Sequence, residues 1–298
     1  MSRVPLQYVA LNDRVCIEVQ GADAAAFLHN QLSRALLELD PADAPLAAWA
    51  DARGRIRALL RVCRLPERWL LLTPRHGAAE LASKLRLFVL RSKVALAPAA
   101  DVHVGALLGD AGAHLAQYEI APHLEPNRTV RRDELSFIRV AERYWQVLGA
   151  PAALEQLAAT LERADDTAAA LAEIRLGVPA IVPESAERYV AQMLNLDVLG
   201  AVSFDKGCYP GQEIIARVHT LGGVKRRARL YAVPGPPPAV GAPVLAGAQT
   251  AGEVVRSAPA QVGSELLAVV EHAAASTHLT CGGAPLRELP LPFALPSD

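Results

Sequence analysis

The residues best suited to chemistry lie in one segment, Lys206-Gly207-Cys208-Tyr209-Pro210-Gly211-Gln212-Glu213, just ahead of a helix-like run. Its two glycines allow a positive φ or a close approach of backbone to a ligand, and its proline suits a turn or a first helical position. Backbone N–H groups at a helix start and the Lys206 ammonium both favour a thiolate. Cys208 is therefore a candidate reactive or metal-binding sulfur. The alternative is a tight turn whose cysteine is a small buried apolar residue.

The sequence around this segment resembles the signature of a known family. The matching pieces are the segment itself, Met193-Leu194-Asn195-Leu196-Asp197, Gly200-Ala201-Val202-Ser203-Phe204 and Ile214-Ile215-Ala216-Arg217. Together they resemble the YgfZ-type folate-binding proteins, relatives of the glycine-cleavage T-protein, which is an aminomethyltransferase. Shorter matches follow in the same order along the chain: Gly21-Ala22-Asp23, Phe27-Leu28, Gln31-Leu32, Asp51, Gly54-Arg55-Ile56, Leu90-Arg91-Ser92-Lys93-Val94, Ile174-Arg175, Gly177 and Pro179.

The resemblance implies a fold, a ligand and a role. The fold is α+β: a pseudo-duplicated folate-binding region over residues 1–225, followed by a small C-terminal β-barrel over residues 226–298. The implied ligand is tetrahydrofolate or another reduced folate. The implied role is support of iron-sulfur cluster assembly or repair and, through iron-sulfur enzymes, of tRNA modification. Its partners would be iron-sulfur assembly proteins or client enzymes, with Cys208 at most a transient cluster ligand and no resident metal.

The same resemblance supplies candidate folate contacts, which are Lys206, Gly207, Tyr209, Gly211, Gln212, Glu213, Arg217, Asn195, Arg14 and Val178. Gln212 and Glu213 could accept pterin N–H groups, and Glu213 could instead cap the helix. Arg14 and Val178 stand where family members commonly carry tryptophan. Losing a ring that stacks on a pterin weakens binding by ~1 to 3 kcal/mol, and Arg14 replaces that stacking in part.

A second difference concerns catalysis. T-proteins carry an acidic pair shortly after the glycine that corresponds to Gly54, whereas this chain has Arg57 and Ala58 there. Neither side chain can accept a proton or balance a developing positive charge, and Asp51 precedes the Gly54 turn. We therefore expect no aminomethyltransferase activity. Two alternatives stay open: a folate-dependent one-carbon transferase that uses another carboxylate, and a scaffold that has lost folate binding.

Two basic clusters and a histidine have several interpretations. Arg53, Arg55 and Arg57 share one strand face, which is either a binding face or a solvated face above the core. Lys225-Arg226-Arg227, with Arg217 and Arg229, could bind the glutamate tail of a folate, contact RNA phosphates or form a charged linker. His219 could pair with Cys208 if the chain folds back, and is otherwise an exposed residue at a helix end.

The elements that must position these residues follow from periodicity. Strands are expected at residues 15–19, 55–64, 69–73, 94–97 and 102–108. Helices are expected at residues 21–37, 76–90, 151–163 and 167–176. Asp166 would cap the last of these helices, and Gly177 and Pro179 would end it. Residues 55–64 and 69–73 form a hairpin. After Arg229, short runs at 229–233, 253–256 and 266–271 between Gly/Pro turns predict the barrel.

Composition limits the classes of partner. The chain has 298 residues, 52% of them apolar, which is enough for a sizeable core in two or more structural units. Its 30 basic and 31 acidic residues give a net charge of -1, so we expect no direct binding to nucleic acid. Four cysteines without metal-ligand spacing favour a reducing, cytoplasmic setting. Prolines interrupt the uncharged stretch 230–252, so we expect no membrane span.

Overall fold

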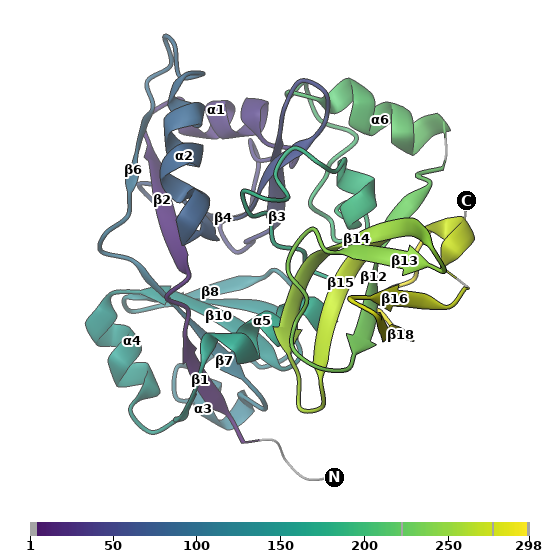
Figure 1. Cartoon of the computed structure of the whole chain (residues 1–298). Helices are drawn as coiled ribbons and strands as arrows, with labels where there is room; N and C mark the ends of the chain where they lie inside the picture. The colour runs from purple at the N-terminus through teal and green to yellow at the C-terminus, as the bar shows by residue number, and fades with distance from the viewer. Residues whose placement is uncertain (1–4, 222, 276, 297–298) are drawn as a thin grey trace. The chain divides into compact units, whose positions relative to one another are not determined.

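The computed structural model describes residues 5–221, 223–275 and 277–296, which form a mixture of helices and sheets (Figure 1). The chain divides into two compact units. The first runs to His29, from Leu36 to Leu46 and from Leu60 to Ala169; the second takes the remaining segments, 30–35, 47–59 and 170 onward. The division passes through two neighbouring strands, β3 (Leu46–Ala50) and β4 (Ile56–Arg64), so neither unit is one continuous stretch of chain.

The first unit contains a six-stranded sheet of order β11-β1-β7-β10-β9-β8. Its strands are β1 (Gln7–Ala10), β7 (His103–Leu108), β8 (Thr129–Arg132), β9 (Leu135–Ala141), β10 (Tyr144–Gly149) and β11 (Glu162–Ala164). Helix α4 (Pro151–Ala158) contacts β7 and β10, and α3 (Gly112–Ala116) lies between β7 and β8 in the chain. Trp145 and Phe137 are buried in the core beneath this sheet.

A five-stranded sheet has the order β3-β4-β5-β2-β6. Its other strands are β2 (Arg14–Gln20), β5 (Trp69–Pro74) and β6 (Ala95–Pro98), and α2 (Arg75–Arg86) packs on β2, β5 and β6. The predicted hairpin is confirmed, because Arg61–Arg64 pair antiparallel with Trp69–Leu72. Every residue from Ala58 to Cys63 is buried, including Arg61, so in this stretch the strand is covered on both faces rather than solvated on one.

The second unit contains a seven-stranded, nearly closed, barrel-like sheet of order β17-β16-β13-β14-β15-β12-β18. Its strands are β12 (Arg226–Val233), β13 (Pro243–Ala246), β14 (Gln249–Pro259), β15 (Ser264–Glu271), β16 (Leu279–Cys281), β17 (Ala284–Pro285) and β18 (Arg287–Leu289), with the short helix η2 (His272–Ala274) after β15. Ile174 of α5 (Asp166–Arg175) packs against Leu230, Ala258 and Leu267 of this sheet. The prediction that short β-strands form the C-terminal part of the chain is confirmed. The duplication of the preceding region and the boundary at 225/226 stay predictions.

Two helix ends differ from the sequence prediction. Helix α1 (Ala24–Gln31) stops well before residue 37, because Leu32 forms a β-bridge with Trp49. Glu162 and Arg163, expected at the end of a helix, lie in β11, and the side chain of Asp165 rather than Asp166 accepts the Ala168 N–H at 3.3 Å. Short-range periodicity could not predict either end, because the partner strands are distant in sequence.

The remaining helices belong to the second unit: the single-turn η1 (Ala191–Leu194) and α6 (Gln212–Leu221). Among the described residues, no helix combines the length and the apolar character that crossing a membrane requires.

Candidate functional site

Cys208 is the exposed cysteine of the four, and it lies in a loop that precedes α6 in the second unit. Cys16, Cys63 and Cys281 are buried. Burial raises the pKa of the Cys63 thiol to about 12, and it also raises the pKa values of Cys16 and Cys281. The three buried thiols therefore stay protonated apolar residues, and Cys208 is the one placed to react or to bind a metal.

Lys206 holds one side of this loop. Its Nζ donates to the carbonyl oxygens of Leu32 at 2.6 Å and Arg34 at 3.3 Å, and it lies 4.7 Å from the centre of the Tyr209 ring. Burial lowers the pKa of the ammonium to about 8. The two carbonyls and the face of the ring act in the opposite direction, because each favours the charged form. Lys206 thus anchors the Cys208 loop to the segment after α1.

Gly211 holds the other side. Its φ is +79°, and a Cβ at this position would lie 2.4 Å from the carbonyl oxygen of Asp51 and 2.6 Å from Cα of Gly54. Gly54 has φ +71° and faces Gly211 and Ile214 in turn. Gly207 and Gly211 were predicted to allow a positive φ or a close approach to a ligand; Gly211 has the positive φ, and its close approach is to the 51–54 turn. Asp51 stabilises that turn, since its Oδ1 accepts the N–H groups of Arg53 at 2.9 Å and Arg55 at 2.8 Å.

The remaining polar side chains of the segment interact within the unit. Gln212 Nε2 donates to the carbonyl of Lys206 at 3.3 Å, which closes the loop. Glu213 pairs with Arg217 at 3.0 Å on the exposed face of α6. Tyr209 is buried, which raises the pKa of its phenol to about 12. Gly207 is exposed beside Cys208.

The contact that the structure gives His219 is aromatic. Its ring stacks on Phe204, with centroids 3.7 Å apart and planes 12° from parallel. His219 is exposed in the last turn of α6, which confirms the second interpretation, and the stacking on Phe204 is an additional contact of its ring.

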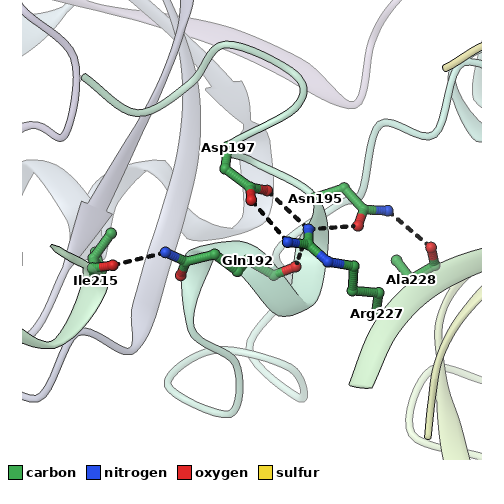
Figure 2. A network of polar contacts seen from close by, with 6 residues as sticks. All are labelled: Gln192, Asn195, Asp197, Ile215, Arg227 and Ala228. Carbon is green, nitrogen blue, oxygen red and sulfur yellow. Dashed lines mark hydrogen bonds and ion pairs between the residues drawn. The ribbon is translucent and has the colours of Figure 1, made fainter. Parts of the chain in front are cut away.

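A buried polar network joins the barrel to the helix that follows the Cys208 loop (Figure 2). Arg227 of β12 forms two hydrogen bonds with the carboxylate of Asp197, at 3.0 and 2.9 Å, and donates to the carbonyl of Gln192 at 3.0 Å. Gln192 Nε2 donates to the carbonyl of Ile215, in α6, at 2.7 Å. Asn195 has φ +57°, ends η1, accepts from Arg227 at 3.3 Å and donates to the Ala228 carbonyl at 2.8 Å. We call these six residues the Arg227 network.

The network changes the interpretation of two sequence features. Asn195 was a candidate folate contact, but both ends of its amide are used inside the protein. The basic cluster after α6 is largely ion-paired as well: Arg227 with Asp197, Arg229 with Glu288 at 2.7 Å and Arg226 with Glu271 at 3.9 Å. Of its three interpretations, the one that these pairs favour is a charged connection between elements.

Two of the three arginines predicted to share a strand face have partners, and β4 begins at Ile56, after Arg53 and Arg55. Arg57 Nε donates to Glu187 at 2.7 Å, and its guanidinium lies 5.1 Å from the Trp49 ring centre. Arg55 donates to the Arg188 carbonyl at 2.7 Å. Sequence reasoning missed Glu187, whose φ of +62° is rare for a residue with a side chain. The carboxylate that lies beside residue 57 is therefore that of Glu187, and it is ion-paired with Arg57 itself.

Arg14 and Val178, the two positions where family members commonly carry tryptophan, belong to different units. Arg14 lies in β2 in the first unit, with Nε 3.7 Å from Asp13, and its side chain is 12% exposed. Val178 follows α5 in the second unit; its N–H donates to the Glu173 carbonyl and its carbonyl accepts from Arg256. Arg256 also forms a buried ion pair with Glu173 at 2.6 Å, which fixes the turn that contains Val178. Their role as folate contacts stays a prediction.

Comparison with solved structures identifies the architecture. Glycine cleavage system aminomethyltransferase T from Bartonella henselae matches with a TM-score of 0.79 and 16% sequence identity, over 96% of this chain and 85% of that one. The chain has the aminomethyltransferase T fold. A heterotetrameric sarcosine oxidase from Corynebacterium sp. U-96, in complex with pyrrole 2-carboxylate, matches 53% of this chain and 82% of that chain with a TM-score of 0.39 and 17% identity. No family model matches the sequence.

Within the aminomethyltransferase T fold of this chain, the structure brings together Lys206, Gly211 and the 51–54 turn around the Cys208 loop. The Arg227 network, Glu187 and the anchoring carbonyls of Leu32 and Arg34 were missed from the sequence. The signal that could have found part of them is the acidic residue Asp197 in the matched piece 193–197, with arginines just after α6.

Proposed function

We propose that this protein is a tetrahydrofolate-binding accessory protein of the YgfZ type, which offers the Cys208 thiol for iron-sulfur cluster assembly or repair. Through iron-sulfur enzymes it would support tRNA modification. The observation that carries the proposal is the presentation of Cys208: an exposed thiol on a loop that Lys206 anchors on one side and Gly211 on the other.

The chemistry of a held thiol suits a transient iron ligand. Thiolate is a soft ligand that binds iron-sulfur clusters, and a preorganised loop loses less conformational entropy when a partner binds. Among the described residues, no group of three or more His, Cys, Asp or Glu side chains could hold a metal ion. A cluster that met Cys208 would therefore take its other ligands from a partner protein, with the cluster as cargo.

Folate is proposed from the resemblance in sequence, and the aminomethyltransferase T fold is consistent with it. Among the candidate contacts, Lys206, Asn195 and the Nε2 of Gln212 hydrogen-bond within the unit. We assign these three residues to holding the Cys208 loop and the adjoining η1 turn. No step of the proposed thiol chemistry requires the folate.

One-carbon transfer is not part of the proposal. Arg57 stands where the acidic pair of the T-protein is expected, and the nearby carboxylate of Glu187 is ion-paired with it. That carboxylate is engaged by the Arg57 guanidinium at 2.7 Å, so the arginine and the carboxylate act as a pair and do not reproduce the two acids of the T-protein. A reduced folate would therefore bind without being turned over.

The thiol is tested in cells that lack the wild-type gene. Cells that carry Cys208→Ser should lose most of the activity of their iron-sulfur enzymes, whereas Asp205→Asn, an exposed change in the same loop, should behave as wild type. Accumulation of both proteins is compared by immunoblot. Wild-type iron-sulfur enzyme activity in the Cys208→Ser cells would overturn the role of the thiol.

The ligand is tested separately, by calorimetric titration of the reduced protein with tetrahydrofolate under anaerobic conditions. We expect saturable binding that Cys208→Ser leaves unchanged, together with no turnover of an aminomethyl donor. Absence of binding at millimolar ligand would favour the scaffold alternative, and turnover would favour the transferase.

A further inference from the structure

A short connection joins α2 to β6 in the first unit (Figure 1). It carries a group of exposed apolar side chains. Leu87 is 73% exposed, Phe88 41% and Leu90 88%. The described residues include seven exposed large apolar side chains, and three of them lie in these four positions. Single exposed apolar residues are ordinary, but a cluster of them marks an interaction surface. We call residues 87–90 the apolar turn.

The backbone of Leu90, in the apolar turn, is strained. Its φ is +47°, in the left-handed region, which costs a residue with a Cβ ~1–2 kcal/mol. The other described residues with a side chain and a positive φ are two asparagines, an aspartate and two glutamates. At 88% exposure Leu90 gains little burial in return. A strained, exposed leucine therefore points to a role outside the packing of this unit.

The apolar turn is rigid rather than a loose loop. Leu87, Phe88 and Val89 donate their N–H groups to carbonyls three residues earlier, and Ser92 donates to Val89. Its far end is held by Asp23, whose Oδ2 accepts the Lys93 N–H at 2.7 Å. A Cβ on Gly21 would lie 2.0 Å from the Lys93 carbonyl oxygen, so a glycine is required beneath the turn.

The surroundings of the apolar turn are basic. Residues 84–93 contain four cations and no acidic residue. Lys84 pairs with Glu80 at 2.6 Å and Arg86 donates to the Leu96 carbonyl at 2.9 Å, whereas Arg91 and Lys93 are exposed. A ligand that covers the three apolar side chains would therefore meet two available positive charges at one end.

We propose that the apolar turn is a docking site for an acidic, amphipathic segment of a partner protein. Aliphatic side chains of that segment would cover Leu87, Phe88 and Leu90, and its carboxylates would pair with Arg91 and Lys93. A protein is favoured over an anionic membrane, because lipid-binding basic clusters carry about four to eight Lys/Arg, whereas this one has the lowest of these numbers and its Lys84 is ion-paired with Glu80. The rigid turn also suits protein recognition, since little order is lost on binding.

The test measures fluorescence anisotropy of labelled synthetic peptides with the full-length protein. The probe peptide alternates leucine at helical spacing with glutamate; one control peptide replaces glutamate by glutamine and another replaces leucine by alanine. We expect the glutamate–leucine peptide to bind best and to weaken as salt is raised. Arg91→Glu should weaken it about tenfold, as loss of a central contact does.

Leu90→Asn separates binding from folding. Asparagine tolerates a positive φ better than leucine, so thermal stability should stay the same or rise while peptide affinity falls about tenfold. The matched control is Val262→Asn, because Val262 is also 88% exposed and lies outside the turn; it should leave affinity unchanged. Equal binding of all three peptides, or equal effects of the two substitutions, would overturn the proposal. So would binding to phosphatidylglycerol vesicles with no binding of the peptides.

Discussion

At the scale of single residues, the position of Cys208 depends on a glycine three residues further on. Gly211 combines a positive φ, which disfavours a side chain, with contact to the 51–54 turn, which leaves no room for one. Gly200 shares the first feature, with φ +68°, but a Cβ there would meet nothing within 4 Å. Comparing substitutions at the two glycines therefore separates the free-energy cost of backbone strain from the cost of steric contact.

We predict that Gly211→Ala destabilises the protein by about 2 kcal/mol more than Gly200→Ala does. Both alanines pay the left-handed strain of ~1–2 kcal/mol, and Gly211→Ala in addition pushes the loop off Asp51 and Gly54. The free energies of unfolding come from urea denaturation. Equal losses for the two variants would show that the contact at Gly211 is not tight.

Residue identity predicted part of this site from the sequence. The glycines, the lysine and the exposed thiol of the segment 206–213 were recognised as a group, because their types and spacing are local information. The acceptors of Lys206 were not, since Leu32 is 174 positions away and contributes only a backbone carbonyl. Every residue has a backbone carbonyl, so the sequence does not show which one accepts a hydrogen bond. The anchoring role of Lys206 is therefore known only from the structure.

At the scale of elements, the Arg227 network fixes η1 and α6 to strand β12 (Figure 2). Arg227 and Asp197 have side chains only 7% and 11% exposed, so removing one partner leaves a buried charge. The neighbouring pair Arg229–Glu288 is more exposed, at 21% and 44%. The two pairs thus offer a buried and an exposed version of the same contact.

We predict that Arg227→Met lowers the free energy of unfolding by about 3–5 kcal/mol, and that the double variant Arg227→Met/Asp197→Leu recovers most of that loss. The second substitution removes the stranded carboxylate. Arg229→Met should cost no more than about 1 kcal/mol. Chemical denaturation of the wild type and these three variants forms the test, and a double variant no more stable than Arg227→Met would contradict the prediction.

Strands were easier to predict than helix ends. Alternation placed the strand at 55–64 nearly to the residue, because apolar residues at every second position carry the pattern. Helix α1 ends six residues before the expected end, where Leu32 pairs with a strand. The β-bridge outweighs the helical preference of the Ala/Leu-rich run, and its partner at residue 49 lies outside any local window.

At the scale of the whole molecule, the sequence predicted an α+β region followed by a barrel, and the sheets agree with this order. The compact units follow a different division, because the second unit takes residues 30–35, 47–59 and everything from 170 onward. The residue pattern along the chain predicts where β structure begins. It does not show that residues 30–35 and 47–59 belong to the same compact unit as the segment from residue 170 onward. The predicted boundary at 225/226 therefore needs its own test.

We predict that a fragment of residues 1–225 does not fold on its own. It would lack Arg227 and Arg256, so Asp197 and Glu173 would lose their buried ion pairs, and it would expose Ile174, which packs against the barrel. Each such loss costs several kcal/mol, comparable with the stability of a whole domain. Near-ultraviolet circular dichroism and gel filtration of the fragment decide the matter. A monomer with native-like spectra and a cooperative thermal transition would instead establish 225/226 as a true domain boundary, with the barrel an appended module.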